Sequence, residues 1–374
     1  MELFEKLSRK FALFLYKTFF RVLAFLSKIS YRCEARKLYL KKGDSLTRNQ
    51  TRQIKRYWNR YTKDFDISFH KYYIKRTGKF DVRFIPDDLF AAYIDPYLNN
   101  REIESGVADK NYFDMYLKGF KMPKTYVHLI NGQYLDNDYK IITFKKACDI
   151  LVKEDRFIVK PSMVSYGGKN IKLFKNVKFS EIKKYLDSDI SDNLIFQEAV
   201  EQSSVTAKLH PDSVNTIRIM TLMINGDIKT LHSSFRIGVG DAVVDNASSG
   251  GIYCGINDDN TLTNYACDAF GKKFNRHPDG GKFGDLDFIF MDKVRETVKA
   301  AAQRFPHFRL IGWDIAIDKK DEPIIIEANL TMSGLDVIQT ICGPVFREYT
   351  EDVLDEVFRN ATKREPYIDI NQFI

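Results

Sequence analysis

The sequence has few cysteines, few histidines and no long uninterrupted apolar run. Its five cysteines are scattered and never in CxxC spacing. This argues against a disulfide framework or a cysteine zinc site and favours a reducing, cytoplasmic location. The six histidines include no evident nucleophile triad, so His210 and His232 are interpreted as structural. No stretch approaches the roughly 18 consecutive apolar residues of a membrane span, and no A-x-A-like site follows the opening segment to indicate a secretory signal.

Positive charge is concentrated at the start of the chain. The 374 residues carry a net charge of +8. Residues 1–64 hold 17 Lys and Arg against five Asp and Glu, about +12, so the remainder sums to about −4. The basic segment 47–65 invites a nucleic-acid interpretation, but no recognisable binding module supports it and no nucleic acid is expected.

The first 30 residues are apolar but interrupted by Lys and Arg, with apolar side chains near helical spacing. One interpretation is an amphipathic helix on an anionic membrane surface. The other is a helix packed on the main body with a basic outer face. Both stay open. The residues with this spacing are Phe11, Phe14, Leu15, Thr18, Phe19, Leu23 and Phe25.

Regular elements are expected from residue 140 onward, after a region at 45–100 that begins helical and basic and then becomes irregular and aromatic. Strands and helices mix without βαβ alternation, which predicts an α+β fold rather than a doubly wound sheet. Asn225-Gly226 predicts a tight hairpin turn between two long strands. Helices are expected within 143–154, 180–187, 286–305 and 349–361, and strands within 156–161, 169–174, 193–200, 215–224, 228–237, 312–317 and 324–329.

The hairpin "GWDIAIDKKDEPIIIEAN", residues 312–329, places polar groups among apolar ones. A six-residue loop would pair Ile317 with Ile324 and thus Asp314 with Glu327, while Asn329 shares the face of Glu327. Two carboxylates and an amide oxygen suit Mg²⁺. Alternatively, one group is solvated at the strand end and the others bond locally.

Three further segments carry candidate phosphate-binding chemistry. Lys160 ends an apolar strand before a loop with Gly167-Gly168, where amide groups can approach phosphate oxygens. Buried Arg218 requires an anionic partner, either a phosphate or a structural carboxylate such as Asp314, and Arg236 accompanies it. The third segment, "FQEAVEQ" at 196–202, is compatible with purine and ribose binding or with a solvated acidic turn.

Together and in this order, "VKP…YGGK", "FQEAVEQ", "NTIRI", "SFRIGVG…DNASSGG" and "GWDIAI…IIIEAN" resemble the ATP-grasp superfamily over about residues 105–345. "HPDSVNTIRI" and "DNASSGGI" are most similar to the ATP-grasp family associated with sugar transfer and surface-polysaccharide gene clusters. The resemblance implies two α+β subdomains that grip ATP, preceded by an N-terminal helical extension. We expect boundaries at 1–60 (basic helical segment), 61–142 (pre-grasp region), 143–202 (lid), 203–345 (large subdomain) and 346–374 (C-terminal helix and tail).

The resemblance also assigns roles to residues. For the nucleotide it implies Lys160, Gly167, Gly168 and Lys169 at the phosphates, Glu198 and Val200 at the adenine, Glu201 or Gln202 near the ribose, and Lys110 as a weaker candidate. For catalysis it implies Arg218, Arg236 and Asn246 at the transferred phosphate. For two Mg²⁺ ions, which Mn²⁺ could replace, it implies Asp314, Glu327 and Asn329. Asn170 stands where relatives have a further glycine, and Asn tolerates the left-handed backbone that such a position requires.

The implied reaction is ATP-dependent carboxylate–amine ligation through an acyl phosphate, modifying a sugar or uronic acid for cell-surface polysaccharide. The alternatives are a sugar or polyol kinase and a non-catalytic nucleotide-binding subunit. The expected partners are ATP, a small-molecule or saccharide carboxylate and an amine. The expected location is the cytoplasm, with peripheral contact of residues 1–60 at the inner membrane surface.

Overall fold

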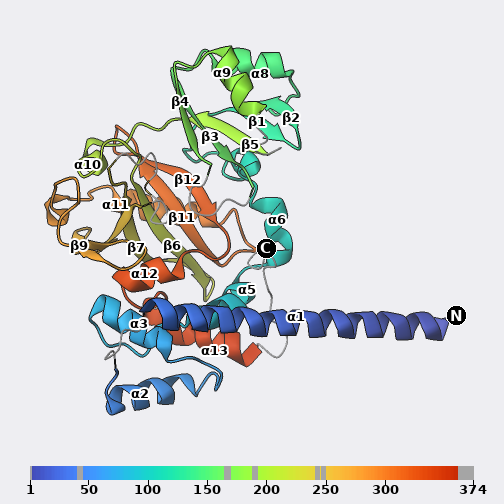
Figure 1. Ribbon diagram of the computed structural model, residues 1–374, viewed down its shortest axis with the longest axis vertical. Helices are drawn as coiled ribbons and strands as arrows, with labels where there is room; N and C mark the ends of the chain where they lie inside the picture. Colours follow the sequence, from blue (N-terminus) through green and yellow to red (C-terminus); the bar gives the residue numbers. More distant parts are fainter. Residues whose placement is uncertain are drawn as a thin grey trace. The chain divides into compact units, whose positions relative to one another are not determined.

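The computed structural model describes residues 2–39, 45–163, 170–187, 193–240, 245 and 250–360 (Figure 1). The chain divides into two compact units. Unit 1 takes in Met1–Arg101, His307–Leu310 and Thr331–Ile374, and unit 2 takes in Glu102–Pro306 and Ile311–Leu330. Helices and strands are mixed as predicted, and the α+β class is confirmed. The five-part division expected from the sequence stays a prediction.

Unit 2 contains a five-stranded antiparallel sheet with strand order β2-β1-β5-β3-β4. Its helices α8 (Phe144–Leu151) and α9 (Phe179–Leu186) pack against it through a core that includes Leu151, Phe157 and Phe196. The predicted helices and strands of this region are confirmed. The strands are β1 (Thr125–Ile130), β2 (Gln133–Asp136), β3 (Arg156–Pro161), β4 (Lys172–Lys175) and β5 (Leu194–Glu198).

Unit 2 also contains a seven-stranded sheet with order β10-β9-β8-β7-β6-β11-β12. The predicted hairpin turns at Asn225-Gly226, where φ is 52° and 77°, the left-handed conformation that such turns need. Helix α11 (Met291–Ala302) packs on β6, β7 and β12. The strands are β6 (Thr216–Ile224), β7 (Asp227–Ile237), β8 (Ile252–Ile256), β9 (Leu262–Cys267), β10 (Lys273–Phe274), β11 (Leu310–Ile317) and β12 (Pro323–Asn329).

Short helical segments connect these sheets. Two of them, η2 (Lys110–Tyr112) and α7 (Phe113–Tyr116), lie just before β1. The others are α6 (Arg101–Val107), α10 (Ser204–Ala207) and η5 (Phe283–Asp285).

Unit 1 is helical. The predicted helix at the start of the chain is α1 (Glu2–Tyr39), and the predicted closing helix is α13 (Thr350–Asn360). Trp58 is fully buried and its indole N–H donates to Val82 O and His70 Nε2 at 2.9 Å. The remaining segments are α2 (Arg48–Trp58), α3 (Ser68–Thr77), α4 (Asp87–Leu89), η1 (Phe90–Ile94), α5 (Asp95–Leu98), α12 (Leu335–Ile341) and η6 (Arg347–Tyr349).

The expectation of irregular structure after the basic helix in 45–100 is wrong, because α3, α4, η1 and α5 follow it. Phe69, Tyr72 and Tyr73 are spaced three and four residues apart and are all buried, so they form the inner face of α3. Aromatic residues at other positions of the same segment obscure this spacing in the sequence.

Candidate active site

Asp314 on β11 and Glu327 on β12 lie directly opposite each other, as predicted. The register elsewhere in the hairpin differs by one residue from the prediction, because Ile317 pairs with Pro323 rather than Ile324. A bulge beside Asp314 restores the expected pairing at the site. The correct carboxylate pair therefore results from two features that compensate, a loop one residue shorter and an extra residue in β12.

Asp314 is buried and ion-paired with two arginines. Arg218 Nε lies 2.6 Å from Asp314 Oδ1 and its Nη2 3.0 Å from Oδ2, a two-pronged contact. Arg236 Nη1 is 3.2 Å from both carboxylate oxygens. Burial alone would raise the pKa of Asp314, but the two guanidinium groups outweigh it and hold the pKa at about 2. The open alternative for Arg218, a structural carboxylate partner, is what the structure contains.

Lysines from two segments approach Glu327. Lys110 is buried, and its Nζ lies 3.1 Å from Glu327 Oε1. Its backbone N–H donates to Ser162 O at 2.9 Å, which links η2 to the residue after β3. Lys160 is also buried. Burial lowers the pKa of Lys160 to about 8, although the nearby Glu327 opposes the shift.

Two aspartates that the sequence did not assign to the site lie near its cations, Asp114 near Lys160 and Asp245 near Arg236. Asp114, four residues after Lys110, acts electrostatically on Lys160, and burial raises its pKa. Asp245 accepts from both the N–H and the hydroxyl of Thr216, and burial raises its pKa to about 6. The sequence signal that could have identified Asp114 is its position four residues after Lys110, one helical turn away.

Asn329 completes the end of the hairpin. Its Nδ2 donates to Gly312 O at 3.0 Å and lies 3.4 Å from Asp314 Oδ2. The amide nitrogen is therefore committed to β11, and the amide oxygen is the atom left to offer a metal. In the described ranges, no group of three or more His, Cys, Asp and Glu side chains has metal-site geometry. The predicted set of two carboxylates and one amide nevertheless has the oxygen chemistry of a Mg²⁺ site.

The predicted nucleotide residues around the end of β5 have local partners. Glu198 is exposed and accepts from Lys124 N at 3.2 Å, and Val200 is half-buried. Glu201 forms ion pairs with Arg156, at 2.9 Å, and with Lys319.

Gln202 orders the loop that leads into β6. Its side chain donates to Ser213 O at 2.6 Å and His210 O at 3.2 Å and accepts from Asn215 N at 3.0 Å. The Asn215 side chain adds bonds to His210 O and Gly238 N. This network fixes the start of β6, and hence the strand that carries Arg218.

Gly167, Gly168, Lys169 and Asn246 lie outside the described residues. Asn170, the first described residue after that gap, has φ of 62°, the left-handed conformation expected of it. The predicted residues that the structure brings together are Lys110, Lys160, Arg218, Arg236, Asp314, Glu327 and Asn329.

Comparisons with known proteins identify the family of the chain. The model of the sugar-transfer associated ATP-grasp family matches residues 89–354. The D-alanine-D-alanine ligase from Coxiella burnetii is similar in structure at 10% identity and a TM-score of 0.43, over 71% of this chain and 62% of that one. The L-amino acid ligase from Bacillus licheniformis is similar at 14% identity and a TM-score of 0.39, over 70% and 48%.

This chain thus spans about three fifths and about half of those two enzymes. A comparison with curated protein sequences gives no match. The family model covers well over half of the chain and confirms the predicted ATP-grasp resemblance. The chain belongs to the sugar-transfer associated ATP-grasp family.

Proposed function

We propose that the protein is an ADP-forming ligase that joins a carboxylate to an amine through an acyl phosphate. The observation that carries this proposal is the pairing of Asp314 with Arg218 and Arg236 beside the Glu327–Lys110 pair. It puts oxygen donors for Mg²⁺ and cations for a transferred phosphate in one place. Membership of the ATP-grasp family supports ATP as the nucleotide.

In the first step, an oxygen of the substrate carboxylate attacks the γ-phosphorus of ATP and the bond to the ADP oxygen breaks. Arg218 and Arg236 would contact the phosphate that is transferred. Both guanidinium groups hold Asp314 in the structure. An entering phosphate would compete for these donors, and the Asp314 oxygens would then become available as ligands. The two arginines would thereby link phosphate binding to metal binding.

Asp314, Glu327 and the Asn329 amide oxygen would hold two Mg²⁺ ions, which Mn²⁺ could replace. Bound there, Mg²⁺ would neutralise charge on the phosphates. Lys110 and Lys160 would bind phosphate oxygens, together with the loop of Gly167, Gly168 and Lys169, and Asn246 would act beside the arginines.

Glu198 and Val200 would contact the adenine of the nucleotide. Of the two ribose candidates we favour Glu201, because its ion pairs are exposed and exchangeable. Gln202 is committed to backbone groups of the 210–215 loop.

In the second step, the amine nitrogen attacks the acyl carbon, inorganic phosphate leaves, and the nitrogen releases a proton. The family's association with sugar transfer supports a uronic acid or another saccharide carboxylate as substrate in surface-polysaccharide assembly. Such acceptors are lipid-linked or polymeric, which suits a cytoplasmic enzyme at the inner membrane face.

The test is purified protein with Mg-ATP and a panel of uronic acids, nucleotide sugars and amino acids. ADP and phosphate release are measured, and products are identified by mass spectrometry. We expect carboxylate-dependent ADP formation with free phosphate and an amide product. Phosphate retained on the product would identify a kinase instead, and AMP would overturn the acyl-phosphate route.

Glu327→Ala should abolish turnover. The matched control is Glu322→Ala, in the same hairpin, where the carboxylate pairs with the exposed Lys293. We expect the control to keep its activity. Unchanged ATP consumption by Glu327→Ala would refute the metal assignment.

A further inference from the structure

Helix α1 carries a strip of exposed apolar side chains. Five of its members follow one another at spacings of four, seven, four and three residues, and the other two each directly precede one of these, so all lie on one side of the helix. Each is at least 41% exposed. The strip consists of Phe11, Phe14, Leu15, Val22, Phe25, Leu26 and Ile29. An exposed apolar surface of this length marks an interaction site.

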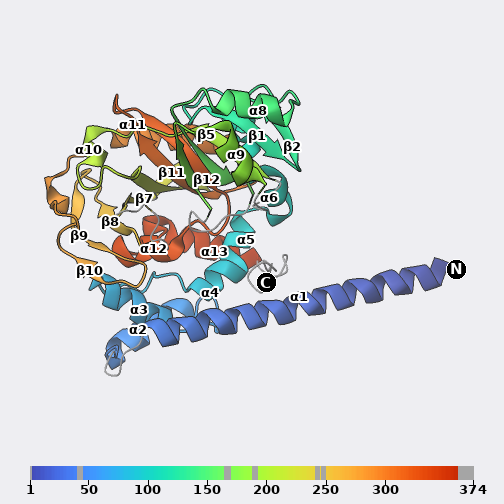
Figure 2. The same cartoon turned by 45° about the horizontal axis from the view of Figure 1, so that its top comes forward.

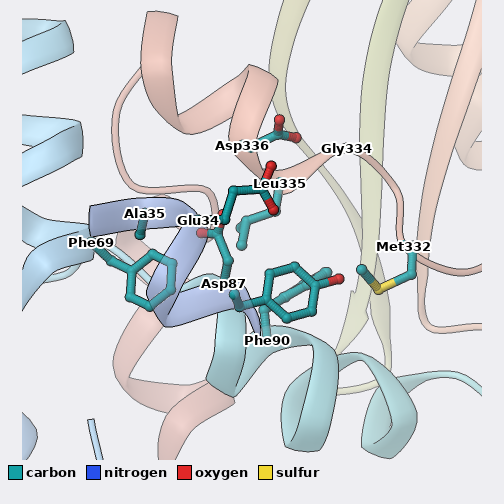
Figure 3. Close-up of a pocket in the computed structure, with 10 residues that line it drawn as sticks. Glu34, Ala35, Phe69, Asp87, Phe90, Met332, Gly334, Leu335 and Asp336 are labelled. Carbon is teal, nitrogen blue, oxygen red and sulfur yellow. The ribbon is translucent and has the colours of Figure 1, made fainter. Parts of the chain in front are cut away.

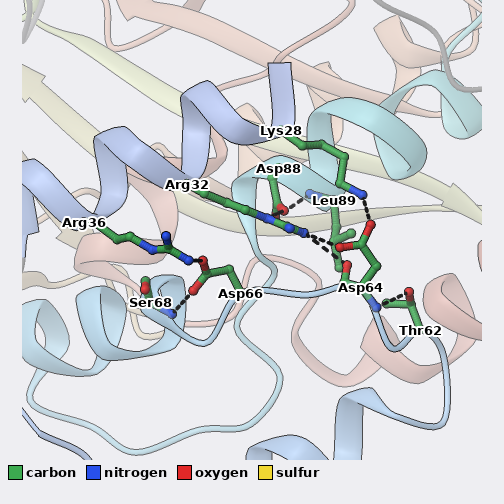
Figure 4. Close-up of polar contacts among 9 residues, drawn as sticks. All are labelled: Lys28, Arg32, Arg36, Thr62, Asp64, Asp66, Ser68, Asp88 and Leu89. Carbon is green, nitrogen blue, oxygen red and sulfur yellow. Dashed lines mark hydrogen bonds and ion pairs between the residues drawn. The ribbon is translucent and has the colours of Figure 1, made fainter. Parts of the chain in front are cut away.

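The C-terminal part of α1 is fixed to the rest of unit 1. Lys28 pairs with Asp64, and Arg32 bridges Asp64 at 2.8 Å and the fully buried Asp88 at 2.6 Å (Figure 4). Arg36 pairs with Asp66 one turn later.

Apolar packing reinforces these ion pairs. Ala35 is buried against Phe69 and Tyr73. Tyr31, Glu34 and Ala35 line a pocket whose other wall includes Leu335 of α12 (Figure 3). These contacts set the rotation of the helix about its axis. The apolar strip cannot turn toward unit 1 without breaking them.

The charge of α1 identifies what the strip contacts. Between Glu5 and Glu34 the sequence contains seven Lys and Arg and no Asp or Glu. Among the described residues, no helix is long and apolar enough to cross a membrane. Within unit 1, α1 runs beside α3 and continues past it (Figure 2). An exposed apolar strip on a helical segment of strong net positive charge is the pattern of a helix that lies in the interface of an anionic bilayer.

We propose that α1 binds the surface of an anionic membrane, with Phe14 and Phe25 inserted among the acyl chains and the net positive charge of the segment attracted to the lipid phosphates. A second copy of the chain is the less favourable occupant, because pairing two such strips would bring two strongly basic helices together. This inference rests on the membrane location given under the proposed function and names the surface that would make the contact. Binding is measured without ATP, so failure of the ligase proposal and failure of this one are separate outcomes.

The experiment is co-sedimentation of the full-length protein with phosphatidylglycerol–phosphatidylcholine vesicles and with pure phosphatidylcholine vesicles. We expect binding to the anionic vesicles that weakens at high salt. Phe14→Glu/Phe25→Glu should reduce the partition coefficient by at least about tenfold, since each ring loses its burial in the acyl region. The control is Phe270→Glu, which alters an equally exposed phenylalanine on unit 2 and should bind like the wild type.

Circular dichroism and gel filtration check that each variant is folded. The proposal is overturned if the wild type does not bind anionic vesicles, or if Phe14→Glu/Phe25→Glu binds them as well as the control does. It is also overturned if a concentration-dependent dimer, lost in that variant, forms without vesicle binding, because the occupant would then be a second copy.

Discussion

Replacing Asp314 with Asn should destabilise unit 2 strongly, in addition to removing a proposed metal ligand. The substitution keeps the side chain's size but leaves Arg218 and Arg236 buried without their shared carboxylate. Removing one partner of a buried ion pair costs about 3–5 kcal/mol, because the remaining charge is uncompensated. Both guanidinium groups contact this carboxylate.

The pKa of Asp314 gives a second value for the stability that this carboxylate contributes. A pKa of about 2 against the ordinary 3.8 corresponds to about 2–3 kcal/mol of stabilisation of the folded state. Because the folded pKa is the lower one, this stabilisation is present above pH 3.8 and is lost as the pH falls through about 2. The truncation cost is larger since Asn cannot carry the charge at any pH. We therefore expect a loss of about 3 kcal/mol at neutral pH.

Urea unfolding followed by tryptophan fluorescence measures this loss for the correct unit. The chain has two tryptophans, and Trp58 lies in unit 1 while Trp313 lies in unit 2 beside Asp314. In a Trp58→Phe background the signal reports unit 2. Asp292→Asn is the control, since it breaks an exposed helix-surface pair with Arg295 and should change little. A loss below about 1 kcal/mol for Asp314→Asn would refute the assignment of an uncompensated buried charge.

Two further predictions concern single residues. Because burial lowers the pKa of Lys160 to about 8, the lysine loses its charge as the pH rises through that value, and the Kd for ATP measured by calorimetry should increase there. The Lys160→Arg variant should show no such increase, because arginine keeps its charge. A Kd of the wild type that does not change with pH would count against phosphate binding by Lys160. In Gly238→Ala, the added Cβ would clash with Ser213 Oγ and lie 2.6 Å from His210 Cδ2, so the variant should be about 1–3 kcal/mol less stable in thermal unfolding. The control is Gly106→Ala, whose added Cβ would have no neighbouring side-chain atom within 4 Å and should not lower the stability.

The sequence predicted the elements around the site better than the register between them. Alternation of side chains along β12 correctly placed Glu327 and Asn329 on one face. It could not reveal the bulge beside Asp314, because a bulge adds a residue within the apolar run Ile324–Ile326 and leaves that run looking continuous. Pro323 was assigned to the loop, although a proline at the first position of a strand loses no necessary hydrogen bond.

The structure also separates polar residues that look alike in the sequence. Gln202 makes bonds to backbone groups within about a dozen residues, and such contacts hold a loop in place. Asp314 instead meets arginines 78 and 96 residues away, and Lys110 meets Glu327 across more than 200 residues.

Local bonding of the first kind can be anticipated from the spacing of Asn, Gln and Ser. The second kind depends on strand order. The Asn225-Gly226 turn joins β6 to β7, but no local signal places β11 next to β6 in the sheet. Because β11 lies next to β6, Arg218 reaches Asp314 and forms an ion pair with it. The sequence alone had left the anionic partner of Arg218 open. A resemblance to a family could therefore name the site residues, whereas only the three-dimensional arrangement shows that two of its arginines share one carboxylate.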